Sequence, residues 1–216
     1  MTPEPLRHGL SSRLLARLLL ALGLSVGLTG CFGFLKPAKS NARHFVLTPL
    51  PPPPSGAAPG KLAVGLGQVK VPSYLFNSSL AIRRGTNEVD YSAPSFWAER
   101  LDTGLQRVLA ADLAVLLPSD QIRLSAWETA DVALEVYVTV DRFDVDAKGE
   151  GNLVAWWRIM SPGGTRILKA GESRLSRPGP APDTDPSGAV ATLSALAADL
   201  SRQLVDAIHQ AATTPR

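Results

Sequence analysis

Cysteine is almost absent from this chain: its 216 residues contain one, Cys31, together with three histidines. A single cysteine forms no internal disulfide, so a sizeable core must stabilise the fold without one. A zinc site needs three or four ligands at suitable spacing, and so few cysteines and histidines do not supply them. We therefore expect no metal and no other cofactor.

Long apolar runs are also missing. The longest in the N-terminal region, Leu18 to Leu28, is 11 residues, whereas a helix needs about 20 to cross a bilayer. Its length suits the apolar region of a signal peptide, and basic residues precede it. The run ends at Leu28-Thr29-Gly30-Cys31, which resembles the lipobox of bacterial lipoproteins. We predict a lipoprotein signal peptide over residues 1–30 and diacylglycerol attachment at Cys31.

An excess of either charge is lacking as well. The formal net charge is +3, but the predicted signal peptide holds three arginines and one glutamate, so 19 basic and 18 acidic residues remain after it. This balance gives no reason to expect a nucleic-acid partner.

The rest of the chain divides into a tether and one domain. Residues 31–61 are predicted to be a lipidated tether with a short strand near His44 to Thr48 and a proline-rich linker. Residues 62–212 are predicted to be a globular domain. Alternating apolar residues predict strands over 62–71, 132–141, 152–160 and 165–175, with a hairpin turn at Gly85-Thr86-Asn87. Gly65 and Gly67 lack the rest of a phosphate-loop motif and predict a strand bulge.

Two amphipathic helices complete the pattern. Ser92 and Pro94 indicate a helix start. The apolar stripe that follows, from Trp97 to Leu116, is interrupted only by Asp112. A second stripe runs from Val190 to Ile208. The order of elements predicts a single α/β domain, a mixed β-sheet with amphipathic helices packed on it.

No constellation typical of an enzyme is present. The Gly-x-Ser-x-Gly motif of α/β-hydrolases occurs only at Gly23 to Gly27, inside the predicted signal peptide, and not in the predicted domain. Asp141, Asp144 and Asp146 resemble the start of a calcium loop, but its glycine and final glutamate are misplaced. We expect a solvated, charged turn from Asp144 to Gly151, and no catalytic residues.

Two groups of large side chains are candidate contacts with a partner or a lipid. Tyr74, Leu75 and Phe76 follow a predicted strand; if exposed they form an apolar contact surface, and if buried they belong to the core. Trp156 and Trp157 must point to opposite faces of a strand. One ring then fills the core and the other lies under a second helix layer or at an interface, and we take Trp157 as the candidate contact.

With these segments in place, the chain resembles the ABC-type transport auxiliary lipoproteins, which include the paraquat-inducible protein C type. Arg100 stands where that family usually has proline, a substitution that favours a helix. The resemblance covers nearly all of the mature chain through the lipobox, the closing Ala- and Leu-rich helix and four short motifs: His44 to Leu47, Val71 to Leu75, Trp97 to Leu101 and Val154 to Trp157.

The resemblance implies a three-layer α/β/α fold and a non-enzymatic auxiliary subunit of an ABC/MCE-type lipid (phospholipid) transport system. Its implied partners are an MCE-domain protein and the ABC permease and ATPase. Phe32 stands where aspartate would retain an enteric lipoprotein in the inner membrane, so that sorting rule implies the inner leaflet of the outer membrane, facing the periplasm. A homo-oligomer would suit this role. The alternative is a stand-alone periplasmic lipid-binding carrier lipoprotein.

Overall fold

The computed structural model describes residues 41–52, 62–117, 119, 121–124 and 126–213. The predicted signal peptide, Cys31 and most of the proline-rich linker lie outside these residues. From Asn41 onward the chain is one compact unit. Its elements are β1 (Arg43–Phe45), β2 (Val64–Leu66), η1 (Ser73–Phe76), β3 (Ser79–Gly85), β4 (Glu88–Trp97), α2 (Leu101–Leu116), β5 (Ile122–Leu124), η2 (Thr129–Asp131), β6 (Leu134–Asp146), β7 (Gly151–Met160), η3 (Pro162–Gly164), β8 (Ile167–Arg177) and α3 (Pro186–Thr213).

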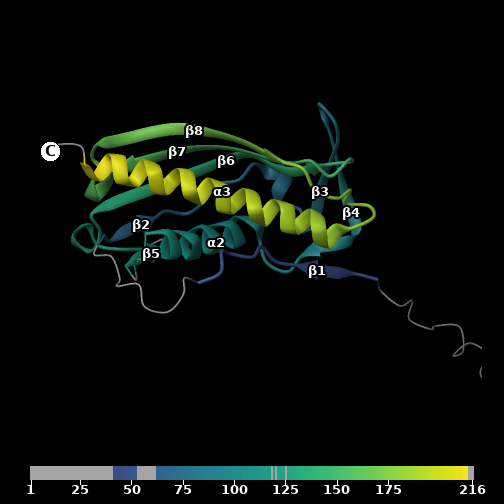
Figure 1. Ribbon diagram of the computed structural model, residues 1–216, viewed down its shortest axis with the longest axis horizontal. Coiled ribbons are helices and arrows are strands. Elements are labelled where there is room, and N and C mark those ends of the chain that lie inside the picture. The colour runs from purple at the N-terminus through teal and green to yellow at the C-terminus, as the bar shows by residue number, and fades with distance from the viewer. Residues whose placement is uncertain (1–40, 53–61, 118, 120, 125, 214–216) are drawn as a thin grey trace, which may run out of the picture. The chain divides into compact units, whose positions relative to one another are not determined.

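Strand β6 is the centre of a mixed eight-stranded sheet (Figure 1). Along one edge it pairs with β7, and β7 pairs with β8, all antiparallel. Its other edge is shared, because β2 pairs with its first residues and β3 with its last, both parallel. The sheet continues from β2 to β5 and from β3 through β4 to β1. The predicted hairpin is confirmed as β3 and β4.

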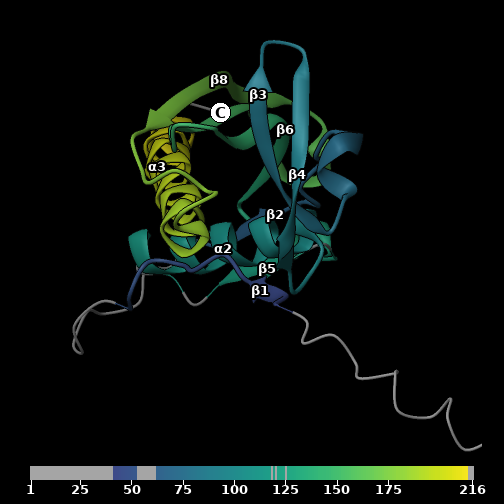
Figure 2. The ribbon, with the colours of Figure 1, turned by 90° about the vertical axis from the view of Figure 1, so that its right-hand side faces the viewer.

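The sheet curls around the two helices, so that both lie on its concave side (Figures 1 and 2). The predicted single α/β domain with a mixed sheet and packed helices is confirmed. In place of a helix layer on each face, the described residues form one helix layer inside a half-barrel. No helix in the described part of the chain combines the length and hydropathy needed to cross a membrane.

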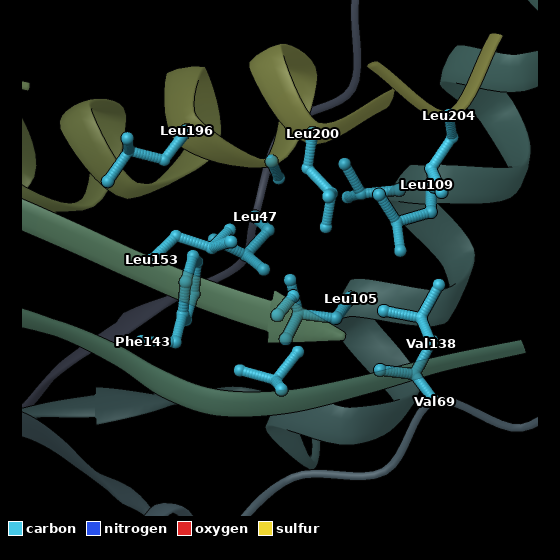
Figure 3. Packing of buried hydrophobic residues seen from close by; sticks show 14 of the residues in the cluster. Leu47, Val69, Leu105, Leu109, Val138, Phe143, Leu153, Leu196, Leu200 and Leu204 are labelled. Atoms are coloured by element: carbon cyan, nitrogen blue, oxygen red, sulfur yellow. The ribbon is translucent and has the colours of Figure 1, made fainter. Parts of the chain in front are cut away.

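The core fills the space between the helices and the concave face (Figure 3). Leu105 and Leu109 of α2 are fully buried, as are Leu200 and Leu204 of α3. They point toward the inward side chains of β6 and β7, among them Val138, Phe143 and Leu153. Apolar burial of this kind contributes about 25 cal/mol per Å², which explains how the fold is stable without a disulfide.

The two glycines near β2 make room for aromatic rings. A Cβ at Gly65 would lie 2.6 Å from the indole of Trp127, and one at Gly67 would lie 2.7 Å from the ring of Tyr137. The predicted bulge is also present. Leu66 lies opposite Val136 and Lys70 opposite Thr139, so the three residues 67–69 lie opposite the two residues 137 and 138, and one residue after β2 is extra.

The predicted start of the first helix is wrong. Strand β4 continues through Pro94 to Trp97, and α2 begins at Leu101. Pro94 is tolerated because β4 has a neighbour on its outer side only from Ser95 onward, where β1 pairs with it. Trp97 is therefore a buried strand residue.

Residues 43–50, which we call the N-terminal strap, are fixed to the domain. After β1, Leu47 is buried in the core, and its carbonyl accepts a hydrogen bond from Arg107 Nη2 at 3.0 Å. The Thr48 N–H donates to Ser194 Oγ of α3, and the Leu50 N–H donates to Asp112 Oδ1 of α2 at 2.7 Å. Both helices thus hold the strap.

Candidate contact surfaces

Tyr74 attaches η1 to the convex side of the sheet. Its hydroxyl donates to Asp144 Oδ2 at 3.1 Å and accepts a hydrogen bond from the Phe143 N–H at 3.4 Å. Burial of Tyr74, reinforced by the charge of Asp144, raises the pKa of the phenol to about 12. Tyr74 is thus a structural anchor for the segment 73–76.

Asp144 is fully buried, which corrects the prediction of a solvated turn beginning at this residue. Strand β6 extends to Asp146, and two arginines share the Asp144 carboxylate. Arg83 Nη2 lies 2.7 Å from Oδ2, and Arg142 Nε lies 2.9 Å from Oδ1. A buried carboxylate is stable only with such partners, and here they come from two different strands.

Leu75 and Phe76 differ in their exposure. Leu75 is buried in the core, whereas the side chain of Phe76 is 55% exposed. The guanidinium of Arg100 lies 5.1 Å from the centre of the Phe76 ring, a cation–π contact. Phe76 lines a cavity of about 250 Å³ together with Trp97 and residues 98–101. We call Phe76, Arg100 and this cavity the Phe76 corner.

The two neighbouring tryptophans take opposite faces, as predicted. Trp157 lies on the concave side, where its ring lies over Gly171 and its Nε1 donates to Ser173 Oγ at 3.0 Å. Ser173 in turn donates to Gln203 of α3. The exposed ring is that of Trp156, at 50%. Whether Trp157 contacts a partner remains a prediction, but the structure places it mostly inside.

A groove of about 470 Å³ surrounds Trp156 on the convex face of β6, β7 and β8. The Trp156 ring is held by its Nε1, which donates to Asp141 Oδ2 at 2.8 Å. Ile167, 58% exposed, adds a second apolar side chain. We call this the outer groove; its principal side chains are those of Gln68, Lys70, Tyr137, Trp156, Arg158 and Ile167.

The charges that line the outer groove are all positive. Lys70 and Arg158 line it, and no acidic residue does. Within the described residues neither cation forms an ion pair; the Arg158 guanidinium lies 5.3 Å from the centre of the Tyr137 ring. The groove therefore offers an apolar surface with two available cations.

The rear of the outer groove is rigid because Glu135 ties three segments together. Its carboxylate accepts hydrogen bonds from Tyr137 Oη at 2.8 Å, from Trp127 Nε1 at 3.2 Å and from the Gly163 N–H at 2.8 Å. These bonds fix the Tyr137 ring over Gly67. Tyr137 and its stacked arginine are thus presented in one orientation.

Both surfaces place an exposed aromatic ring beside an arginine. In the described part of the chain, no three His, Cys, Asp or Glu side chains are placed to hold a metal ion.

Lys70, Trp156 and Arg158 were not identified from the sequence as neighbours on one surface. Strand alternation puts Trp156 and Arg158 on one face, but the pairing that adds Lys70 is long-range.

Comparison with known proteins gives a family and a fold. The profile of a family described as "ABC-type transport auxiliary lipoprotein component" matches residues 45–205. A crystal structure of an uncharacterised protein is similar with a TM-score of 0.60 at 20% identity, covering 76% of this chain and 97% of that one. A Xanthomonas campestris protein of family DUF330 is similar with a TM-score of 0.59 at 14% identity, covering 76% and 92%. At these identities both structures show the fold alone. No curated protein sequence matches the chain.

Proposed function

The chain belongs to the ABC-type transport auxiliary lipoprotein family, and from this premise we propose that it is a non-enzymatic, lipid-anchored auxiliary subunit of an MCE-type lipid transport system. The family match over residues 45–205 is the observation that carries the proposal. The partners in this proposal are the MCE-domain protein, the permease and the ATPase.

The proposed anchor is a lipid at Cys31, holding the domain at the inner leaflet of the outer membrane. Each buried CH₂ contributes about 0.8 kcal/mol, so several acyl chains make attachment effectively permanent. Radiolabelled palmitate is expected to enter the protein in cells and to be lost in Cys31→Ser. Label in a purified inner-membrane fraction alone would contradict the outer-membrane assignment.

We propose the Phe76 corner as the contact with the protein partner. An exposed aromatic ring beside an arginine and a small cavity is typical of the residues that contribute most to protein interfaces. Tyr74 and Leu75 fix the position of Phe76 through Asp144 and the core. Little ordering of this segment is then needed when a partner binds.

The test is affinity purification of the full-length lipoprotein from membranes solubilised in mild detergent. We expect an MCE-domain protein in the eluate, and about tenfold weaker association for Phe76→Ala. Trp156→Ala, which removes an equally exposed aromatic ring elsewhere, is the matched control and should retain the partner. Recovery of no transporter component would contradict the proposed function. Equal losses in both variants would contradict the assignment of the corner.

A stand-alone lipid carrier is the alternative, favoured by the apolar outer groove. A carrier would retain a lipid through purification, so native mass spectrometry of the unanchored protein separates the two functions. Stoichiometric phospholipid would support the carrier. The same spectra report whether the proposed subunit is a homo-oligomer.

A further inference from the structure

The outer groove combines three features that a purely structural surface does not need. First, its two cations, Lys70 and Arg158, have no acidic partner in the described structure, although nine other ion pairs are present there. The acids nearest to Trp156 are engaged otherwise. Asp141 accepts its indole N–H, and Glu172 pairs with Arg174.

Second, the large apolar side chains that line the groove with these cations are exposed. Trp156 and Ile167 are among the five most exposed large hydrophobic residues described, and both line this groove. Tryptophan and tyrosine rings favour the boundary between water and lipid, where an apolar ring and a polar tip are both satisfied. Trp156 and Tyr137 have this character, each with its polar atom already hydrogen-bonded.

Third, neither α2 nor α3 covers this groove. Both lie inside the curl (Figures 1 and 2), and on the convex side of β6 the contacts of η1 and of the turn at Gly163 are near its two ends, at Asp144 and Glu135. Asn41 follows the predicted lipid site by ten residues, which span at most about 33–36 Å. A domain on so short a connection stays within reach of the bilayer that holds it.

We propose that the outer groove docks on an anionic lipid surface. Lys70 and Arg158 contact the phosphates of the headgroups, and Trp156 and Ile167 enter the boundary with the acyl chains. Charge complementarity selects this occupant, since the groove presents two cations and no lining acid. This proposal depends on the proposed function in one respect only, namely that the lipid anchor keeps the domain near a bilayer. The proposed contact with the protein partner lies elsewhere, at the Phe76 corner.

The experiment measures vesicle binding without the lipid anchor. The chain lacking residues 1–30 and carrying Cys31→Ser is sedimented with vesicles of phosphatidylglycerol or of phosphatidylcholine. We expect binding to the anionic vesicles, weakened in high salt. Each cation near an anionic surface accounts for about a fivefold change in affinity, so Lys70→Gln with Arg158→Gln should weaken binding about 25-fold.

A charge-matched control separates the groove from general electrostatics. Arg123→Gln with Lys148→Gln removes the same two charges outside the groove and should bind nearly as the parent does. Phosphatidylglycerol with brominated acyl chains should quench the tryptophan fluorescence, and Trp156→Phe should remove most of that quenching. Quenching that persists in Trp156→Phe would overturn the placement.

Three further results would overturn the proposal: equal binding to both vesicle types, equal losses in both double variants, or release by millimolar inorganic phosphate at constant ionic strength. The last would indicate a site for the free ion. Loss of the transporter partner in Lys70→Gln with Arg158→Gln, with vesicle binding retained, would assign the groove to a protein. Failure to recover a partner in the affinity purification leaves the vesicle result unaffected, so the two proposals fail separately.

Discussion

Substitution of Asp112 is the strongest test of how the two α-helices hold the N-terminal strap. Its carboxylate is fully buried between α2, α3 and the strap, and it accepts hydrogen bonds from the Leu50 N–H at 2.7 Å and from Ser201 Oγ at 3.0 Å. No cation forms an ion pair with it in the described structure. Burial raises the pKa of this carboxyl, although the Leu50 bond partly opposes the shift.

Replacing Asp112 by Ala and by Asn separates the hydrogen bonds from the charge. Asp112→Ala leaves the Leu50 N–H buried without an acceptor, at a cost of about 1–3 kcal/mol, and opens a small cavity worth about 1 kcal/mol. A loss of about 2–4 kcal/mol lowers the Tm by roughly 4–16 °C for a domain of this size. Asp112→Asn keeps an acceptor for Leu50 and removes a buried charge, so at pH 7 it should match or exceed the parent.

The pH dependence has a defined sign. A carboxyl whose pKa is raised on folding contributes stability that is fully present below its unfolded pKa, 3.8, and is lost as the pH rises through the folded pKa. The advantage of Asp112→Asn over the parent should therefore grow as the pH rises from about 4 toward 7.

Urea unfolding followed by circular dichroism measures these differences, with Asp206→Asn on the exposed face of α3 as the control. The control should stay within about 0.5 kcal/mol of the parent. If Asp112→Asn at pH 7 destabilised as strongly as Asp112→Ala, the reasoning would be refuted, because the charge itself would then hold the strap.

Three other predictions concern the convex side. Gly65→Ala should cost about 1–3 kcal/mol in urea unfolding and alter tryptophan fluorescence, since the new Cβ meets the Trp127 indole; an unchanged stability would show that the indole moves freely. Asp144→Ala should cost about 3–5 kcal/mol, because it leaves two arginine side chains without their shared carboxylate; a thermal melt unchanged by this substitution would contradict the role of the cluster. Absorbance at 295 nm should show a tyrosine that ionises near pH 12, and Tyr74→Phe should remove this step, while Tyr137, whose pKa is also raised, still ionises; the stability linked to the raised pKa of Tyr74 is lost as the pH rises from 10 toward 12.

The sequence predicts the fold well where contacts are local. Strand alternation places β7 and β8 to within two residues, because successive antiparallel strands are joined by short turns. It also finds the start of β6, but this strand runs to Asp146, five residues beyond the prediction. The start of α2 could not be found this way. Ser92 and Pro94 satisfy a local helix signal, but pairing of β4 with β3 and β1 outweighs it.

Buried acids were the least predictable residues of the candidate surfaces. From the sequence alone, Asp144 is predicted to belong to a charged turn. In the structure it is buried, because Arg83, 61 positions earlier in the sequence, binds its carboxylate. Strand alternation places Glu135 on the more solvated face of its strand. In the structure Trp127 and the turn at Gly163 cover this face at Glu135 and donate hydrogen bonds to its carboxylate. Likewise, alternation separates Trp156 from Trp157, but only the concave position of Val138, opposite Trp157, decides which ring is inside.

The N-terminal strap also determines how a force on the proposed lipid anchor would reach the domain. Force entering at Arg43 would run along β1, parallel to β4, and load their hydrogen bonds in shear. It would also load the bond that Arg107 donates to the strap and the bonds that Ser194 and Asp112 accept from it. The described part of the domain thus begins its contacts at β1 (Arg43–Phe45), well before residue 62. If the proposed lipid at Cys31 holds the protein at a bilayer, a load from it would therefore reach the sheet and both α-helices through the first strand of the fold.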